Sequence, residues 1–311
     1  MTEQIVKGSF TDYVFLFGDC RTAYSDHMAR AACSAGKLYI LMRGEKRGGF
    51  ICLLSDGDCM RIRYVCVAPE MRRSGVCRAL ISYVVRAEGR VRISITESME
   101  YADALEHLCK SLHFYKDADV YIYQSSRNLE DFSKWQDYME TKGKFLCDFL
   151  IRQGFFTVSF KDAQSWQTDY IRHSCENSFQ NSLPVNLFLD EKDRLMDPDL
   201  SFLAIKRDVS IIYKGKERQG VPAAYSLVSR QDETSVVFEQ LSAGETYLQT
   251  GCIFLPFARS MEAFWESGYR RAAYAIVEGN HRANAFRRKL LTKITGDVCK
   301  ARNYIYGGKA L

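Results

Sequence analysis

The sequence has 311 residues, of which 47% are hydrophobic and 26% are charged, and its formal net charge at pH 7 is +5. This length predicts about two domains with sizeable cores. No apolar run reaches the roughly 18 residues of a membrane-spanning helix, and the first residues lack a signal-peptide pattern, so we expect a cytoplasmic protein without a membrane anchor. The eleven cysteines and five histidines show no paired ligand spacing, which argues against a metal enzyme.

The first 125 residues predict alternating strands and helices. The sequence predicts a strand at Phe10–Phe17, a helix at Arg21–Ser34, and a meander of strands at Lys37–Arg43, Gly49–Leu54 and Met60–Val67. Beyond these, it predicts a helix from Val76, a strand at Arg90–Thr96, a helix at Tyr101–Leu112 and a strand at Val120–Tyr123. This order is β-α-β-β-β-α-β-α-β.

The stretch Tyr64–Gly89 carries the clearest functional signal. Its alternating apolar residues predict a strand that ends at Pro69, and apolar residues at helical spacing begin at Val76. Between them lies Arg72-Arg73-Ser74-Gly75. A helix that starts behind such a loop presents free backbone N–H groups and the positive end of its dipole, and anions bind there. Two arginines and a glycine fit a pyrophosphate better than a single carboxylate.

This loop resembles a family signature. Arg72-Arg73-Ser74-Gly75-Val76-Cys77 is similar to the [RQ]-x-x-G-x-[GA] motif of the GNAT superfamily of acyl-CoA-dependent N-acyltransferases, with Cys77 in the place of Gly or Ala. The resemblance covers roughly residues 8–125. It implies that acetyl-CoA is the co-substrate, and that the CoA-binding residues are Val65, Cys66, Val67, Arg72, Arg73, Ser74, Gly75, Val76, Cys77 and Arg78. A solvated surface loop is the alternative interpretation.

The second half of the chain repeats the order of elements without a visible residue-level repeat. We predict a linker at 126–143 and then strands at Phe155–Phe160, Ser201–Lys206, Val209–Lys214, Ala223–Ser229, Ser235–Leu241, Ala272–Val277 and Arg302–Tyr306. Helices are predicted at Ala163–Asn177, Val185–Met196, Gly251–Ser267 and from Asn280. The corresponding loop, Gln249-Thr250-Gly251-Cys252, has no arginine. Glu278–Ala283 resembles the N-x-x-A motif of the family.

We therefore expect an α/β (α+β) fold with two GNAT-like domains, each a mixed, mostly antiparallel sheet flanked by helices. The first domain would span 1–125 and hold the CoA pyrophosphate loop. The second would span 144–311 with a degenerate loop, and an unrelated α+β domain is the alternative there.

The resemblance also implies a general base and a general acid. An amine with a pKa of about 10.4 must lose a proton before it attacks a thioester. Glu97, after the predicted strand 90–96, and Glu239, in the second half, are candidate bases. Their alternative roles are a helix-start acid, which interacts with the dipole, and an exposed strand residue. The family tyrosine falls on Cys109, which we expect to pack. Tyr115 is a candidate acid, although packing against the core is the more common role of a tyrosine that begins a strand.

The sequence thus favours an acetyl-CoA-dependent N-acetyltransferase whose acceptor is a small-molecule or peptide amine. Two alternatives remain: a non-catalytic CoA-binding or scaffold protein, and an aminoacyl-tRNA-dependent transferase. The modest net charge argues against nucleic acid as a partner. The acceptor, the acyl chain and the oligomeric state are not determined by the sequence.

Overall fold

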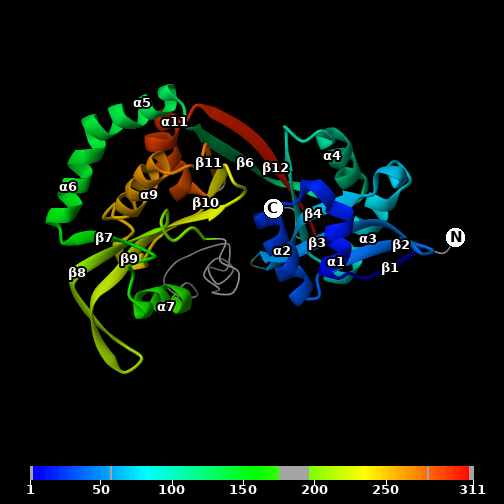
Figure 1. The fold of residues 1–311 in the computed structure, drawn as a ribbon, viewed down its shortest axis with the longest axis horizontal. Coiled ribbons are helices and arrows are strands. Elements are labelled where there is room, and N and C mark those ends of the chain that lie inside the picture. Colours follow the sequence, from blue (N-terminus) through cyan, green and yellow to red (C-terminus); the bar gives the residue numbers. More distant parts are fainter. Residues whose placement is uncertain (1–2, 57, 175–195, 279, 308–311) are drawn as a thin grey trace. The chain divides into compact units, whose positions relative to one another are not determined.

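The computed structural model describes every residue except 1–2, 57, 175–195, 279 and 308–311. The chain divides into two compact units. Figure 1 draws the chain as a ribbon coloured from the N-terminus in blue to the C-terminus in red. The N-terminal unit contains Met1–Tyr121, Val277–Asn280 and Cys299–Leu311, and the C-terminal unit contains Ile122–Ile276 and His281–Val298. The helix predicted at Val185–Met196 lies, up to residue 195, outside the described residues.

The N-terminal unit is a mixed sheet with helices on both faces. Its elements are β1 (Glu3–Lys7), α1 (Phe10–Phe17), η1 (Gly18–Cys20), α2 (Ala23–Ser34), β2 (Leu38–Arg43), β3 (Lys46–Asp56), β4 (Cys59–Val67), η2 (Pro69–Met71), α3 (Val76–Glu88), β5 (Val91–Thr96), α4 (Ala102–Ser111), the first part of β6 (Tyr115–Ser126) and most of β12 (Asp297–Tyr306). The order of its strands is β1-β2-β3-β4-β5-β12-β6. The predicted meander and the mixed α/β class are confirmed.

Phe10–Phe17 is a helix, so the strand predicted there is wrong. Ser9 caps the helix: its hydroxyl accepts from the backbone N–H of Asp12, and the Asp12 carboxylate accepts from the Ser9 N–H. This reciprocal cap outweighs the strand preference of the aromatic residues in the segment. The first strand lies earlier, at β1.

The two faces of this sheet carry separate cores. Leu41, Ile51 and Leu53 point to the face where α3 and α4 pack, and they form one cluster with Leu80 and Cys109. The alternate residues of the same strands point the other way. Phe50 packs edge-on against Tyr13 of α1, with ring centroids 5.4 Å apart, and the Cys52 thiol contacts the Met28 carbonyl of α2. This alternation is what a strand buried on both faces requires.

The C-terminal unit has a similar order of elements. It contains α5 (Leu129–Tyr138), a π-helical segment (Met139–Gly143), α6 (Lys144–Arg152), β7 (Phe155–Ser159), α7 (Ser165–Ser174), β8 (Phe202–Tyr213), β9 (Lys216–Arg230), β10 (Ser235–Ala243), η5 (Glu245–Tyr247), α9 (Phe254–Glu266), β11 (Arg271–Val277), α10 (His281–Phe286), a second π-helical segment (Arg287–Leu291) and α11 (Thr292–Ile294). From the second part of β6, its strands follow the order β6-β11-β10-β9-β8-β7.

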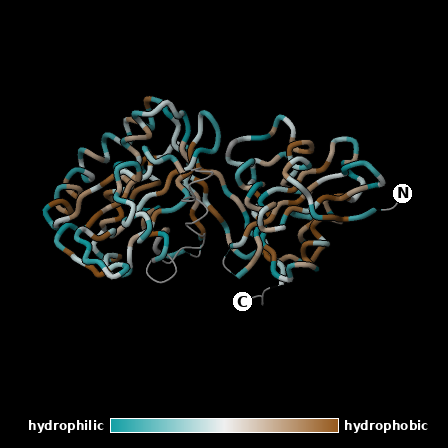
Figure 2. Tube along the Cα trace, turned by 60° about the horizontal axis from the view of Figure 1, so that its bottom comes forward, coloured by the Kyte–Doolittle hydropathy of each residue, from teal (hydrophilic) through white to brown (hydrophobic). Residues whose placement is uncertain are grey.

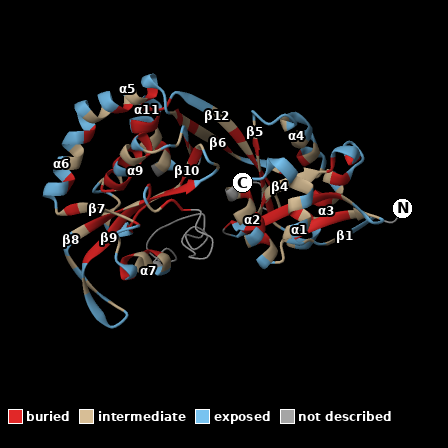
Figure 3. Cartoon of the chain, in the orientation of Figure 1, coloured by how far each residue is buried: buried red, intermediate tan, exposed pale blue. Residues whose placement is uncertain are grey.

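The predicted linker at 126–143 is largely helical and packs on the C-terminal unit. Trp135 of α5 is 3% exposed, and its ring lies 6.3 Å from that of Phe257 in α9. Figure 3 shows α9 with many buried residues, and Figure 2 shows hydrophobic stretches interspersed with hydrophilic ones along the chain. Aromatic burial therefore fixes this segment as part of the core.

The last strand differs most from expectation. The sequence places Arg302–Tyr306 in a second domain at 144–311, whereas the structure places Cys299–Leu311 in the N-terminal unit. β12 pairs antiparallel with β5, from Ala301 opposite Thr96 to Tyr306 opposite Val91. The alternation of a strand predicts that it joins a sheet, but not which sheet it joins.

Candidate active site

The site begins where two parallel strands separate. β4 and β5 pair from Met60 opposite Val91 to Ile62 opposite Ile93. The register between β3 and β4 then shifts, because Tyr64 pairs with Cys52 while Ile62 pairs with Leu53, which leaves Arg63 as an extra residue. A β-bulge of this kind bends its strand and ends pairing on one side. No pairing with β5 is recorded for the described residues of β4 beyond the bulge.

The residues predicted to bind CoA follow this opening. Val65, Cys66 and Val67 form the end of β4 and are half-buried. The Cys66 thiol contacts the Leu16 carbonyl of α1, and burial raises the pKa of this thiol. In this part of β4, the backbone N–H and C=O groups on the edge that faces β5 are therefore the polar groups that can contact a ligand.

The loop after β4 is held in shape by its own hydrogen bonds. Ser74 donates its hydroxyl to the Met71 carbonyl at 2.6 Å, and Arg43 of β2 donates to both the hydroxyl and the carbonyl of Ser74 at 2.9 and 2.7 Å. Gly75 follows with φ 87°, in the left-handed region that favours glycine. Arg73 also has a positive φ, 63°.

The start of α3 leaves backbone donors available. The first helical bond into the loop runs from the Ala79 N–H to the Gly75 carbonyl. The N–H groups of Val76, Cys77 and Arg78 precede that bond, and none of them has a hydrogen-bond partner among the described residues. Gly75 has no side chain to cap them, and a Cβ built on it would meet no atom within 4 Å. These residues therefore fit a pyrophosphate, which accepts from such donors.

The side chains around this helix start are mostly exposed arginines. Arg72, Arg73 and Arg78 are all exposed. Arg72 contacts the Tyr101 hydroxyl at 3.4 Å, and Arg78 donates to the Ser111 hydroxyl at 2.7 Å. These partners are neutral, so the positive charge of both guanidiniums remains available for an anion.

Cys77 occupies the position that departs from the family motif, and its side chain points inward. It packs against the core beside Val76, and burial raises the pKa of its thiol to about 11. A thiol with this pKa is neutral at pH 7 and takes no part in nucleophilic chemistry. The cysteine therefore leaves the exposed surface of the loop unchanged.

The predicted acid and base residues lie on different elements. Glu97 follows β5, is 46% exposed at its side chain, and pairs with Arg302 of β12 at 3.2 Å. Tyr115 begins β6 in the same unit and is half-buried. Glu239 belongs to the C-terminal unit, where it is the extra residue of a bulge: Phe238 pairs with Val228 and Gln240 with Leu227.

Cys109, at the place of the family tyrosine, is fully buried. It packs in the core, as the sequence predicts. Burial raises the pKa of its thiol to about 12, so this thiol cannot deliver a proton near neutral pH.

The C-terminal unit repeats the same opening but not the same anion site. β10 and β11 pair only as far as Phe238 opposite Tyr274, just before the Glu239 bulge. The next loop repeats the turn of the first, with Gly251 at φ 77°. Here, however, the Cys252 N–H donates to the Thr250 hydroxyl at 3.2 Å, and the Phe254 N–H donates to the Gly251 carbonyl at 3.0 Å. Two of the three N–H groups that follow Gly251 are therefore used within the loop itself.

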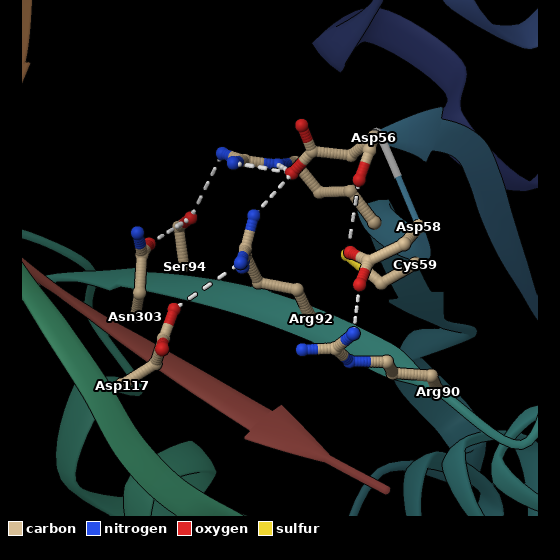
Figure 4. Close-up of polar contacts among 9 residues, drawn as sticks. Asp56, Asp58, Cys59, Arg90, Arg92, Ser94, Asp117 and Asn303 are labelled. Carbon is tan, nitrogen blue, oxygen red and sulfur yellow. Dashed lines mark hydrogen bonds and ion pairs between the residues drawn. The ribbon is translucent and has the colours of Figure 1, made fainter. Parts of the chain in front are cut away.

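A buried ionic network lies on the sheet beside the β4–β5 pair (Figure 4). Asp56 at the end of β3 is 1% exposed at its side chain, and it accepts from Arg61 at 2.6 Å and from Arg92 at 2.8 Å. Ser94 of β5 donates to Asn303 of β12 at 2.6 Å. The network ties β3, β4 and β5 together where the parallel pairing is intact, and Ser94 ties β12 to β5.

Arg43, Tyr101 and Arg302 contact predicted site residues and have no signal in the sequence. They lie in β2, before α4 and in β12, far along the chain from the residues they contact. Arginine is common on the exposed faces of strands, so the contacts of Arg43 and Arg302 become apparent only in the folded sheet.

Among the described residues, no group of three His, Cys, Asp or Glu side chains could hold a metal ion. Within the same residues, no helix is long and apolar enough to cross a membrane.

Comparisons with known proteins agree with this architecture. Residues 4–118 match the model of the acetyltransferase (GNAT) family, and no curated protein matches the chain. A tandem GNAT protein from the clavulanic acid biosynthesis pathway aligns over 100% of both chains, with a TM-score of 0.59 and 13% identity. A GCN5-related N-acetyltransferase from Sphaerobacter thermophilus aligns over 97% of this chain and 95% of its own, with a TM-score of 0.54 and 10% identity.

A third structure is similar over most of this chain. It is a glucosamine N-acetyltransferase region of a fungal multi-domain β-N-acetylglucosaminidase, with a TM-score of 0.62 and 10% identity over 98% of this chain and 38% of that one. Identities this low show the fold, and the family match covers the unit that contains the loop after β4. Residues 4–118 therefore match the GNAT family, whose members are acyltransferases, and the chain as a whole has a tandem arrangement of the GNAT fold.

Proposed function

We propose that this protein is an acetyl-CoA-dependent N-acetyltransferase that binds CoA once, in the N-terminal unit, and acetylates a primary amine of a small molecule or peptide. One observation carries the proposal: the start of α3 has three backbone donors without a partner among the described residues and exposed arginines, whereas the loop before α9 uses two of its three donors internally and has no arginine. CoA would supply the acyl group as a thioester.

Two parts of the chain would bind the pyrophosphate and the pantetheine arm of CoA. The N–H groups of Val76, Cys77 and Arg78 would hold the pyrophosphate, with charge supplied by Arg72 and Arg73. The edge of β4 beyond the Arg63 bulge would hydrogen-bond the amide groups of the pantetheine arm, as a sheet edge binds an added strand. Bound in this way, the thioester is positioned against the amine, and positioning supplies a large share of the rate.

The proton of the amine would pass to a carboxylate. Glu97 lies at the end of β5, beside the opening, and Arg302 holds its carboxylate at the surface. Solvent exposure allows Glu97 to take the proton through a water molecule. Glu239 has in the C-terminal unit the bulge position that Arg63 has in β4, and it would act as a base only if that second opening also bound the thioester.

Titration calorimetry with acetyl-CoA tests the binding step. We expect one site per chain, which Arg72→Ala/Arg73→Ala should weaken by about tenfold or more for each guanidinium, because charge-assisted hydrogen bonds contribute about 1.5–3 kcal/mol each. Arg86→Ala is the matched control, since Arg86 is exposed at the other end of the same helix. Full binding by the double variant would refute the proposed site.

CoA release, measured by chromatography across a panel of amines, tests catalysis. Glu97→Gln and Glu239→Gln should leave the dissociation constant of acetyl-CoA unchanged, and the variant of the true base should lose about 10²–10⁴-fold in rate. The burial of Cys109 favours a second candidate, a non-catalytic CoA-binding protein, because the family acid is missing. Binding without CoA release for any amine would support that candidate, and salt-sensitive tRNA binding would support the tRNA-dependent one.

A further inference from the structure

A second polar cavity lies in the C-terminal unit, outside the predicted site. It has a volume of about 710 Å³ and lies between α7 and the far end of the β8–β9 hairpin. Five cationic side chains and one carboxylate line it, together with three aromatic rings: Lys161, Arg172, Lys214, Lys216, Arg218, Asp169, Phe160, Trp166 and Tyr213. A volume of this size is typical of small-molecule sites.

The hairpin that carries most of these cations extends beyond the shared fold. β8 has 12 residues, whereas β2, in the same place of the N-terminal unit, has 6. After a register shift past Lys206, the strands pair again from Ser210 opposite Gln219 to Tyr213 opposite Lys216. Ile212 in this extension is 82% exposed, so the extension does not serve to bury apolar surface on both faces.

The single carboxylate of the cavity is already occupied. Asp169 of α7 accepts from Lys214 at 2.5 Å and from the Tyr213 hydroxyl at 3.0 Å. The Lys214 hydrogen bond is the main cause that holds the pKa of Asp169 below its usual value, against the opposing effect of burial. Asp169 therefore fixes the tip of the hairpin to α7, and Lys161 pairs separately with Asp199 at 2.9 Å.

Two cations of the hairpin have no acidic partner in the part of the chain that the structure describes. Lys216 and Arg218 form no ion pair there. The Arg218 guanidinium lies over the Trp166 ring at 5.7 Å, and its Nε is buried without a hydrogen-bond partner among the residues that the structure describes. Trp166 thus orients a cation at the cavity wall, and a buried donor without an acceptor costs free energy unless a ligand supplies one.

We propose that the cavity between α7 and the distal β8–β9 hairpin binds a phosphorylated small molecule. Lys216 and Arg218, two cations without an acidic partner among the described residues, face one space together with Lys161, and this arrangement matches a multiply charged anion better than a single carboxylate. Guanidinium and ammonium groups are the usual phosphate partners. The proposal does not depend on the proposed acetyltransferase function, because it uses no residue of the CoA site.

Calorimetry with inorganic phosphate, pyrophosphate, AMP and ADP on the full chain tests the proposal. We expect at least one of them to bind. Lys216→Gln/Arg218→Gln should weaken that binding by about tenfold or more for each cation. Because the CoA loop could also bind pyrophosphate or ADP, the titrations are repeated in the Arg72→Ala/Arg73→Ala background, where the binding that depends on Lys216 and Arg218 should persist. Lys289→Gln/Lys293→Gln, two exposed lysines of the same unit, control for net charge.

Fluorescence gives an independent readout. A ligand that draws Arg218 from the Trp166 ring should change the emission, and Trp166→Phe should abolish the change while Trp265→Phe preserves it. Lys216→Gln alone keeps the Arg218 contact, so it serves if the double variant does not fold. The absence of binding by all four compounds, binding that survives the hairpin substitutions, or binding only of RNA or acidic peptides would overturn the proposal.

Discussion

Gly75 and Arg73 show how single backbone positions shape the candidate site. Both have a positive φ, 87° and 63°, so the loop turns sharply just before α3. The turn points the N–H groups of Val76 and Cys77 out of the helix, where an anion can reach them. Glycine adopts this conformation at no steric cost, which gives the motif a physical reason for its glycine.

We predict that Gly75→Ala lowers the free energy of unfolding by about 1–2 kcal/mol, because an L-residue with a Cβ is strained in the left-handed region. Chemical denaturation measures this change. Gly268→Ala is the control: no atom lies within 4 Å of its added Cβ and its φ is not left-handed, so its effect should stay within about 0.5 kcal/mol. Equal effects of the two substitutions would contradict this view of the loop.

Asp56 is the second position where one residue has a large expected effect. It is almost fully buried between Arg61 and Arg92, whereas Asp58, two residues later, is 69% exposed and contacts Arg90 (Figure 4). Removing one partner of a buried ionic group leaves uncompensated charge.

We therefore predict that Asp56→Asn lowers the free energy of unfolding by about 3–5 kcal/mol. Asp58→Asn should cost less than about 1 kcal/mol, since its ion pair is exposed. Thermal and denaturant unfolding of the two variants, compared with the wild type, distinguish them. A small effect of Asp56→Asn would show that the two arginines find other partners.

At the scale of elements, β12 is held to α4 as well as to β5. Glu106 of α4 accepts from Arg302 at 2.6 Å, and Lys110 lies 2.9 Å from it. A hydrogen bond from the Tyr304 hydroxyl is the largest of the causes that lower the pKa of Glu106 to about 2. One carboxylate thus ties two elements that are far apart in the chain.

This arrangement predicts a dependence of stability on pH. Because the pKa of Glu106 is lower in the folded state, its contribution is complete above its unfolded pKa of about 4.5 and is lost as the pH falls toward 2. Glu106→Gln should therefore reduce the free energy of unfolding by roughly 1–3 kcal/mol at pH 7, and this difference should shrink between pH 4.5 and pH 2. A difference that is constant across this range would exclude the linkage.

Helix and strand types were largely predictable, and the failures have local causes. Segments with strong alternation, such as Val91–Thr96, formed the expected strands because both periodicity and burial agree. Phe10–Phe17 was misread because the Ser9 cap, not the apolar content, decides its conformation. The bulges at Arg63 and Glu239 have no glycine or proline to mark them, so the separation of β4 from β5 could not be predicted.

For the whole molecule, the N-terminal unit depends on the end of the chain, because its sheet includes β12. β12 supplies the strand beside β5, and Asn303, Arg302 and Tyr304 add side-chain contacts to that unit. A fragment that ends after β6 would expose an unpaired edge of β5 and part of the core.

We predict that the fragment 1–126 alone is unfolded or aggregated. Residues 1–126 joined through a flexible linker of about 15 residues to 297–307 should fold, because such a linker can span the length of a strand. Circular dichroism and acetyl-CoA titration of the two proteins provide the measurement. A matched fusion with Asn303 and Tyr304 replaced by glycine is the control, and folding of 1–126 alone would contradict the prediction.

The sequence by itself determined the features that depend on neighbours along the chain. The loop Arg72–Gly75, its strand and its helix follow from local patterning, as does the weaker loop around Gly251, because backbone conformation and helix ends are set within a few residues. Only the tertiary structure decided that β12 completes the N-terminal sheet, that the donors at the start of α3 are free while two of the three after Gly251 are used, and that Glu97 meets Arg302. These features depend on pairings between residues far apart in the chain, and the pattern of one strand contains no information about its partner.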